Sequence, residues 1–277
     1  MTWWAIDVRT AAAERDALAA WLVGRTGQAV EEAADGMLVS FAADEAETDR
    51  LLGALRARYG TTLEVERRGL VETDWSTRWR DGLGPRRIGR LVVTPSWMET
   101  EAGPGEVLVV LDPETAFGSG EHGSTRGALA LLERAVRRGD RVLDLGSGSG
   151  ILAIAAVALG AARATGIEID AEAVPVAAHN AERNSIGATC EFLVGHAGAL
   201  APLLGPADIV LSNILRTANE SLFPAIRAAL RPGGLAIFAG MEEVEEPLFR
   251  PALAAAGFVM LDDVRDAGWW SVTGRRA

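Results

Sequence analysis

The chain has 277 residues, 49% of them hydrophobic and 23% charged, a composition that supports a buried core and excludes wholesale disorder. Its formal net charge of −11 is spread along the sequence without a basic face, so we expect no direct binding of nucleic acid. The longest apolar run, residues 151–159, is well short of the about 20 residues that span a membrane, and residues 1–7 have the pattern of a strand. We therefore expect neither a membrane anchor nor a secretion signal.

The first 70 residues predict a small α+β domain. The pattern indicates four strands and two helices, the strands at 3–8, 29–32, 37–41 and 62–66 and the helices at 11–23 and 44–59. Gly24 and Gly60 follow the helices, as expected where helices end. The order strand, helix, strand, strand, helix, strand is that of a ferredoxin-like domain. The pattern does not indicate what this domain does.

Residues 71–106 are expected to form a linker. Asp74 is a suitable cap for a short helix that carries Trp75 and Trp79 on one face. We interpret the two tryptophans as packing between domains. Glycines and prolines interrupt the remainder and predict no regular structure there, at positions 82, 84, 85, 95, 103, 104 and 105.

From residue 107 onward, strands alternate with helices. Strands are expected at 107–111, 141–145, 164–169, 192–194, 208–212 and 235–239, and helices at 124–138, 150–159, 171–184, 220–230 and 243–256. A hairpin around residues 266–268 closes the chain. This alternation predicts an α/β domain with a parallel, doubly wound sheet and an antiparallel finish.

A glycine-rich loop follows the strand that ends at Leu145. Residues 146–150 read Gly-Ser-Gly-Ser-Gly and lead into an apolar helix. Glycines at such a turn let backbone amides approach a ligand. The nicotinamide-binding fingerprint requires its third glycine at the position of Ile151, so that fingerprint is absent. With Asp144 ahead of it, the loop resembles motif I of the class I methyltransferases, which bind S-adenosylmethionine.

Two polar residues end the neighbouring strands. Glu168 lies 22 residues after Gly146, where an acid can accept hydrogen bonds from ribose hydroxyls. Asn213 ends a later strand, which places its amide at the carboxyl edge of the sheet, beside the crevice where ligands bind. Methyltransferases that act on amino nitrogens often have Asn or Asp here, followed by two prolines. This chain has Ile214 and Leu215 instead, which argues against the DNA adenine and glutamine enzymes.

Several segments together resemble the PrmA family, the methyltransferases of ribosomal protein L11. The most specific is Leu-Asp-Pro-Glu-Thr-Ala-Phe-Gly-Ser-Gly-Glu-His-Gly-Ser-Thr at 111–125. It is joined by Gly-Ser-Gly-Ile-Leu-Ala-Ile-Ala at 148–155 and Asn-Ile-Leu at 213–215, with support from 74–80 and 94–97. The resemblance covers nearly the whole chain and is weakest over residues 1–70.

The resemblance implies a domain plan and a reaction. Residues 1–70 are expected to recognise the ribosomal protein, residues 71–106 to link the domains, and residues 107–277 to form a Rossmann-like, seven-stranded class I methyltransferase domain. The family transfers methyl groups from S-adenosylmethionine to lysine side-chain amines and an N-terminal amine. The implied partner is therefore ribosomal protein L11, and we expect a monomer.

The resemblance also implies site residues. Cofactor contacts carry over onto Thr125, Gly146, Gly148, Glu168 and Asn213, and onto Phe117 in a loop that covers the cofactor. Asn213 is the expected catalytic residue, because its carbonyl can hold the target amine. Four positions depart from the family, which usually has Asp at 168 and often has Cys at 147, Pro at 123 and Ala at 216. The added methylene of Glu168 still reaches a ribose diol, whereas Arg216 bears on the choice of target.

Other features narrow the chemistry. Three histidines and one cysteine lack metal-ligand spacing, so we expect no metal. The single cysteine excludes a disulfide framework and favours a reducing cytosol, hence a cytoplasmic protein. The chain contains arginine but no lysine. An amine acceptor needs to be neutral, and desolvation beside a sulfonium lowers its pKa, so no dedicated base is required.

Three alternatives remain open from the sequence. The nearest is a class I methyltransferase that acts on another protein lysine or on a small amine. A nicotinamide-dependent dehydrogenase is a second, against which Ile151 argues. A cofactor-binding adaptor without catalysis is the third.

Overall fold

The computed structural model describes residues 4–10, 14–26, 30–32, 37–42, 44–60, 63–69, 83–114 and 116–277. The chain divides into two compact units, residues 1–78 and 79–277. No helix within the described ranges is long and apolar enough to cross a membrane. The expected helix after Asp74, with Trp75 and Trp79, lies outside the described residues.

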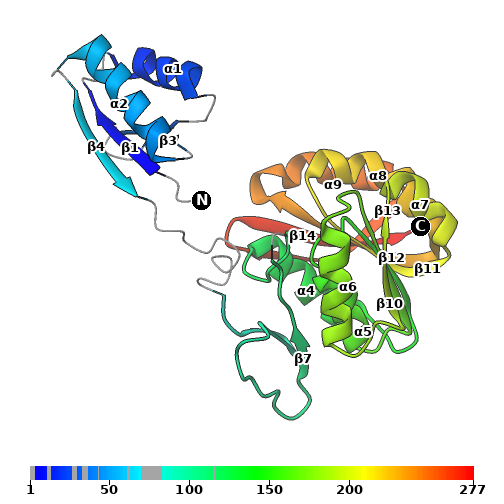
Figure 1. Ribbon diagram of the computed structural model, residues 1–277. Helices are drawn as coiled ribbons and strands as arrows, with labels where there is room; N and C mark the ends of the chain where they lie inside the picture. The colour runs from blue at the N-terminus through cyan, green and yellow to red at the C-terminus, as the bar shows by residue number, and fades with distance from the viewer. Residues whose placement is uncertain are drawn as a thin grey trace. The chain divides into compact units, whose positions relative to one another are not determined.

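The first unit has the predicted ferredoxin-like fold. Its elements are β1 (Trp4–Arg9), α1 (Arg15–Thr26), β2 (Glu31–Glu32), β3 (Leu38–Ala42), α2 (Glu45–Tyr59) and β4 (Glu64–Gly69). The strands form an antiparallel sheet in the order β2-β3-β1-β4. Ile6 and Val8 of β1 pack with Leu18 of α1 and Leu55 of α2 in one small core. Blue to cyan ribbons mark this unit in Figure 1.

The second unit is built on a seven-stranded sheet, as predicted for a class I methyltransferase. Its strands are β8 (Arg141–Leu145), β9 (Arg163–Glu168), β10 (Cys190–Val194), β11 (Ala207–Asn213), β12 (Leu230–Glu242), β13 (Phe258–Asp266) and β14 (Trp269–Arg276). They lie in the order β10-β9-β8-β11-β12-β14-β13, with β14 antiparallel to both neighbours. The order reverses between β8 and β11, the point at which ligands bind in open α/β sheets.

Helices cover both faces of this sheet (Figure 1). One face carries α4 (Gly123–Ala135), α5 (Ile151–Ala158) and α6 (Ala173–Arg183), and the other carries α7 (Ala197–Leu204), α8 (Arg216–Ala229), η2 (Glu243–Glu245) and α9 (Glu246–Ala255). Successive strand residues alternate between two cores, so Val142 packs on the α4 side and Leu143 on the α8 side. Both faces being buried explains why these strands are nearly continuous apolar runs.

The absence of regular structure predicted for residues 71–106 is wrong for part of that stretch. β5 (Arg86–Ile88), β6 (Leu91–Thr94) and β7 (Val107–Val110) form a three-stranded sheet within the second unit. Of the glycines named above as interruptions, Gly105, with φ +81°, lies in the turn that precedes β7. Glycines that permit tight turns were thus read as breaks in the chain.

Two helix predictions on the other side of the sheet also need correction. α7 is absent from the helices expected above, because Gly198 and Pro202 weaken its helical pattern. α8 begins at Arg216, four residues before the predicted start at Glu220. Both helices begin beside the carboxyl edge of the sheet, so both errors fall near the candidate site.

Asp144 is a fully buried carboxyl group in the central strand β8. Its Oδ2 accepts a hydrogen bond of 3.1 Å from the Ala153 backbone N–H, and its Oδ1 has no partner. Burial and, to a smaller extent, the Glu168 charge raise the pKa of Asp144 to about 7, against the lowering effect of the Ala153 N–H. The folded protein therefore holds this proton more tightly than the unfolded chain does.

We expect the free energy of unfolding to contain a term that falls as pH rises from about 4 to about 7, where only the folded state keeps the Asp144 proton. Asp144→Asn should remove this term, so the variant should gain stability relative to the wild type across that range. Denaturant unfolding at each pH, monitored by pulsed hydrogen exchange of the β8 amides, measures this pH-dependent part of the free energy of unfolding. Glu101→Gln, at an exposed position, is the control. Equal pH slopes for wild type and Asp144→Asn would contradict the assignment.

Candidate active site

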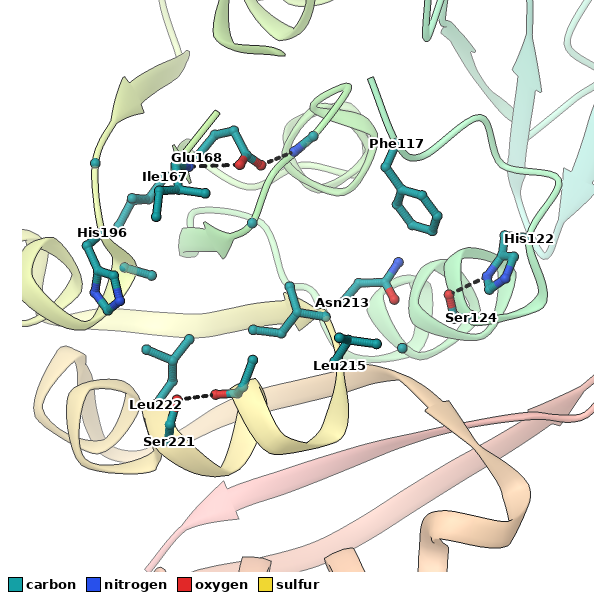
Figure 2. Close-up of a pocket in the computed structure, with 18 of the residues that line it drawn as sticks. Phe117, His122, Ser124, Ile167, Glu168, His196, Asn213, Leu215, Ser221 and Leu222 are labelled. Atoms are coloured by element: carbon teal, nitrogen blue, oxygen red, sulfur yellow. Dashed lines mark hydrogen bonds between the residues drawn. The ribbon is translucent and has the colours of Figure 1, made fainter. Parts of the chain in front are cut away.

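A cavity of about 560 Å³ lies at the carboxyl ends of β8, β9 and β11. Five of the six expected site residues line it: Phe117, Gly146, Gly148, Glu168 and Asn213. In Figure 2, Glu168, Asn213 and Phe117 extend toward the same space from three separate segments of the chain. The fold therefore brings together residues that are up to 96 positions apart, from 117 to 213.

The glycine loop shapes one wall of this cavity by close backbone contact. Gly146 and Gly148 have φ of +73° and +50°, which other residues rarely adopt. A Cβ at Gly148 would lie 2.5 Å from the Phe117 carbonyl oxygen, and one at Gly146 would lie 2.7 Å from Ile214 Cγ2. Only glycine fits either position, because the Phe117 segment and Ile214 pack directly against the backbone of the loop.

Glu168 connects the end of β9 to the glycine loop. Its Oε2 accepts a hydrogen bond of 2.9 Å from Gly148 N–H, and its Oε1 accepts from the N–H groups of Ile169 and Asp170 at 2.8 and 3.0 Å. These bonds fix the orientation of the carboxylate (Figure 2). A carboxylate has about four acceptor sites, so it keeps capacity for a hydroxyl donor from a ligand.

Asn213 ends β11 with one polar atom unpaired. Its Nδ2 donates a hydrogen bond of 3.2 Å to Thr125 Oγ1, whereas its Oδ1 has no partner. Thr125 lies in α4, is 0% exposed and does not line the cavity. The structure thus places Thr125 behind Asn213, where it orients the amide.

The loop that carries Phe117 is attached to the glycine loop. Ser149 donates two hydrogen bonds, from its N–H to the Phe117 carbonyl at 2.9 Å and from its Oγ to the Gly118 carbonyl at 2.7 Å. The Phe117 side chain is 59% exposed at the rim of the cavity. An exposed aromatic ring on a loop fixed in this way is suited to cover a bound ligand.

An aromatic cluster that the sequence pattern does not predict lies at the same rim. The rings of His122 and Trp269 are 4.2 Å apart, and those of His122 and Phe117 are 5.5 Å apart. His122 Nδ1 shares a hydrogen bond of 2.7 Å with Ser124 Oγ. Burial, followed by the charge of Arg126, lowers the pKa of His122, so the imidazole is neutral near pH 7.

The sequence held one signal for Trp269, its place directly after the predicted hairpin turn. Arg126 binds Asp266 of that hairpin through Nε and Nη2 at 2.6 and 2.8 Å. This pairing fixes the hairpin beside α4.

At the far end of the cavity, His196 lines the wall and caps α7 by accepting from Gly198 N–H at 3.1 Å.

Arg216 does not line the cavity. Its Nη1 lies 2.6 Å from Glu220 Oε1, and its Nε lies 3.1 Å from Glu245 Oε1. Two carboxylates therefore neutralise the positive charge that departs from the family pattern.

Across the residues that the structure describes, no group of three or more His, Cys, Asp or Glu side chains could hold a metal ion.

Comparisons with known proteins identify the family of the chain. The family model "Ribosomal protein L11 methyltransferase (PrmA)" matches residues 5–277. A ribosomal protein L11 methyltransferase of Pelotomaculum thermopropionicum is 39% identical over 238 residues, which cover 84% of this chain and 77% of that protein. One from Thermus thermophilus is 41% identical over 198 residues, covering 72% and 76%.

A solved structure gives the same result. The crystal structure of the ribosomal protein L11 methylase from Lactobacillus delbrueckii subsp. bulgaricus has a TM-score of 0.64 and 30% identity, and it covers 70% of this chain and all of that one. With a family match over nearly the whole sequence, the chain belongs to the PrmA family of ribosomal protein L11 methyltransferases.

Proposed function

We propose that this protein transfers methyl groups from S-adenosylmethionine to lysine side-chain and N-terminal amines of ribosomal protein L11. The relatives named above are L11 methyltransferases. The observation that carries the proposal is Asn213, which lines a cavity together with the glycine loop and Glu168 and whose Oδ1 is buried without a hydrogen-bond partner. An unpaired acceptor at that place suits an N–H donor from a substrate.

The residues present fit the cofactor. Gly146 and Gly148 line the cavity without side chains, so a ligand can come close to the backbone of the loop there, and the Glu168 carboxylate beside it can accept from ribose hydroxyls. Phe117 would cover the bound molecule from the loop attached to Ser149. Thr125 would act through Asn213 and not by contact with the cofactor.

The chain's own residues need only select and align the acceptor. S-adenosylmethionine, when bound, would supply a methyl group on a positively charged sulfur, with a neutral thioether as the leaving group. Asn213 Oδ1 accepts one N–H of the amine and so directs its lone pair. The chemistry depends mostly on positioning, and an amine proton is lost to solvent.

The amine must be neutral before it reacts. A lysine pKa of about 10.4 makes deprotonation at pH 7 cost roughly 4–5 kcal/mol, which burial reduces by lowering that pKa. The neutral ring of His122 and the rings of Phe117 and Trp269 form the apolar rim where this burial would occur.

We further propose that the first unit recognises the ribosomal protein.

Purified L11 incubated with this protein and S-adenosylmethionine should gain mass in steps of one methyl group, as measured by intact-protein mass spectrometry. Peptide mapping should place the methyl groups on amine nitrogens. Heat-inactivated protein is the control. An unchanged L11 mass, with cofactor binding verified by calorimetry on the same preparation, would refute the proposed substrate.

Asn213→Ala should lower kcat for L11 by about tenfold or more, because removal of a positioning hydrogen bond of about 1.4 kcal/mol is worth a factor of ten. Asn213→Asp keeps an acceptor oxygen at the same place and should retain more activity than the alanine variant. Steady-state kinetics at saturating cofactor measures both. Full turnover by Asn213→Ala would rule out this role.

Thr125→Val should lower kcat by a few-fold while leaving cofactor affinity nearly unchanged, since Thr125 contacts Asn213 and not the cavity. Valine keeps the buried volume of the threonine but removes the acceptor for Asn213 Nδ2. In a double-mutant cycle with Asn213→Ala, the effect of Thr125→Val should vanish. Additive effects of the two substitutions would show that Thr125 does not act through Asn213.

A further inference from the structure

A second cavity of about 430 Å³ shares part of its wall with the first. Phe117 and His122 line both cavities, and the remaining lining residues come from the loop before α4 and from Leu83. No residue of the glycine loop itself, and none that ends a strand of the large sheet, is among the residues that line it. The second cavity thus opens onto the aromatic rim without offering a further cradle for the cofactor.

The electrostatics of this second cavity depend on one carboxylate. Glu121 lines the cavity but is paired with Arg86, whose Nη2 lies 2.6 Å from Glu121 Oε2. Glu114 also lines it, is exposed, and makes no hydrogen bond or ion pair with any residue that the structure describes. Glu114 is therefore the free negative charge of the cavity.

The backbone at Glu114 is strained. Its φ is +50°, in the left-handed region that glycine adopts freely and other residues adopt at a cost of about 1 kcal/mol. Such strain concentrates at functional sites. An unpaired carboxylate held in this conformation on a cavity wall is suited to bind a cation.

We infer that the second cavity is the vestibule through which the acceptor amine of the substrate protein reaches Asn213, and that Glu114 attracts this amine in its protonated form. The inference rests on the proposed function and adds to it the route of the acceptor. A lysine or N-terminal ammonium is the cation that such a site takes. The amine then passes the partition made by Phe117 and His122, which is aromatic and carries no charge that would repel it.

The direction from which the acceptor amine approaches follows from the residues that line the first cavity. The glycine loop and Glu168 hold one side of it, so the acceptor must arrive from another side to meet the transferred group in line. The shared wall at Phe117 and His122 lies at the rim where the second cavity begins. No covalent step is added to the reaction already described.

The lysine-free sequence makes a direct test possible. Glu114→Lys and Ser119→Lys each place one lysine on the vestibule wall of the full-length protein, and Glu101→Lys places one at an exposed position that lines neither cavity. With S-adenosylmethionine alone, at least one vestibule lysine should be methylated about tenfold faster than the lysine at 101, at a rate independent of protein concentration, as expected for an intramolecular acceptor. Peptide mapping locates the methyl group.

Methylation of neither vestibule lysine, or equal rates at 101 and in the vestibule, would overturn the inference. Each variant preparation is first tested on L11. Wild-type protein that fails to methylate L11 refutes the proposed function, whereas active wild type with unreactive vestibule lysines refutes only the route. The two failures are therefore distinguishable.

A second measurement tests the charge of Glu114 separately. Glu114→Gln should raise KM for L11 by about two- to fivefold at low ionic strength, leave kcat and cofactor affinity within about twofold, and lose its effect at high salt. Glu114→Gly should have the same effect on KM. Because glycine adopts the left-handed φ without strain, this variant should fold even if Glu114→Gln does not. Glu101→Gln is the matched control. An unchanged KM for both Glu114 variants would remove Glu114 from the inference.

Discussion

The site depends on close contact between backbone segments at the carboxyl edge of the seven-stranded sheet. The glycine loop touches the Phe117 carbonyl at Gly148, and Ile214 packs against both Gly146 and Gly240. No side chain fits between these segments. The loop after β8, the loop before α4 and the end of β11 therefore hold one another in place, and the space that remains between them is the cavity.

Buried side-chain amides maintain this arrangement from behind. Asn180 of α6 pairs with the backbone N–H and carbonyl of Asp112 at 2.9 and 3.0 Å and donates to the Ser149 carbonyl at 3.1 Å. Asn219 of α8 donates to the carbonyls of Ile214 and Ala239, each at 3.0 Å. These bonds satisfy backbone groups that neither helix nor sheet pairs, so the loops around the cavity are fixed without regular structure.

Charge is arranged to fit a cationic acceptor. Arg216, Arg126 and Arg86 are each held by carboxylates, and His122 is neutral. The one unpaired charge on the proposed vestibule is the negative charge of Glu114 among the described residues. A chain without lysine also presents no side-chain amine of its own to the site that we propose for amines.

The sequence by itself determined the two folds, the glycine loop and the polar residues that end the strands, because hydrophobic periodicity and glycine spacing are local signals. It did not determine α7, the small sheet at 86–110 or the place of Trp269, because those depend on packing between distant segments. The role of Thr125 shows the difference. Only the tertiary structure places its hydroxyl behind Asn213, 88 residues away, and leaves Asn213 Oδ1 unpaired at the wall of the cavity.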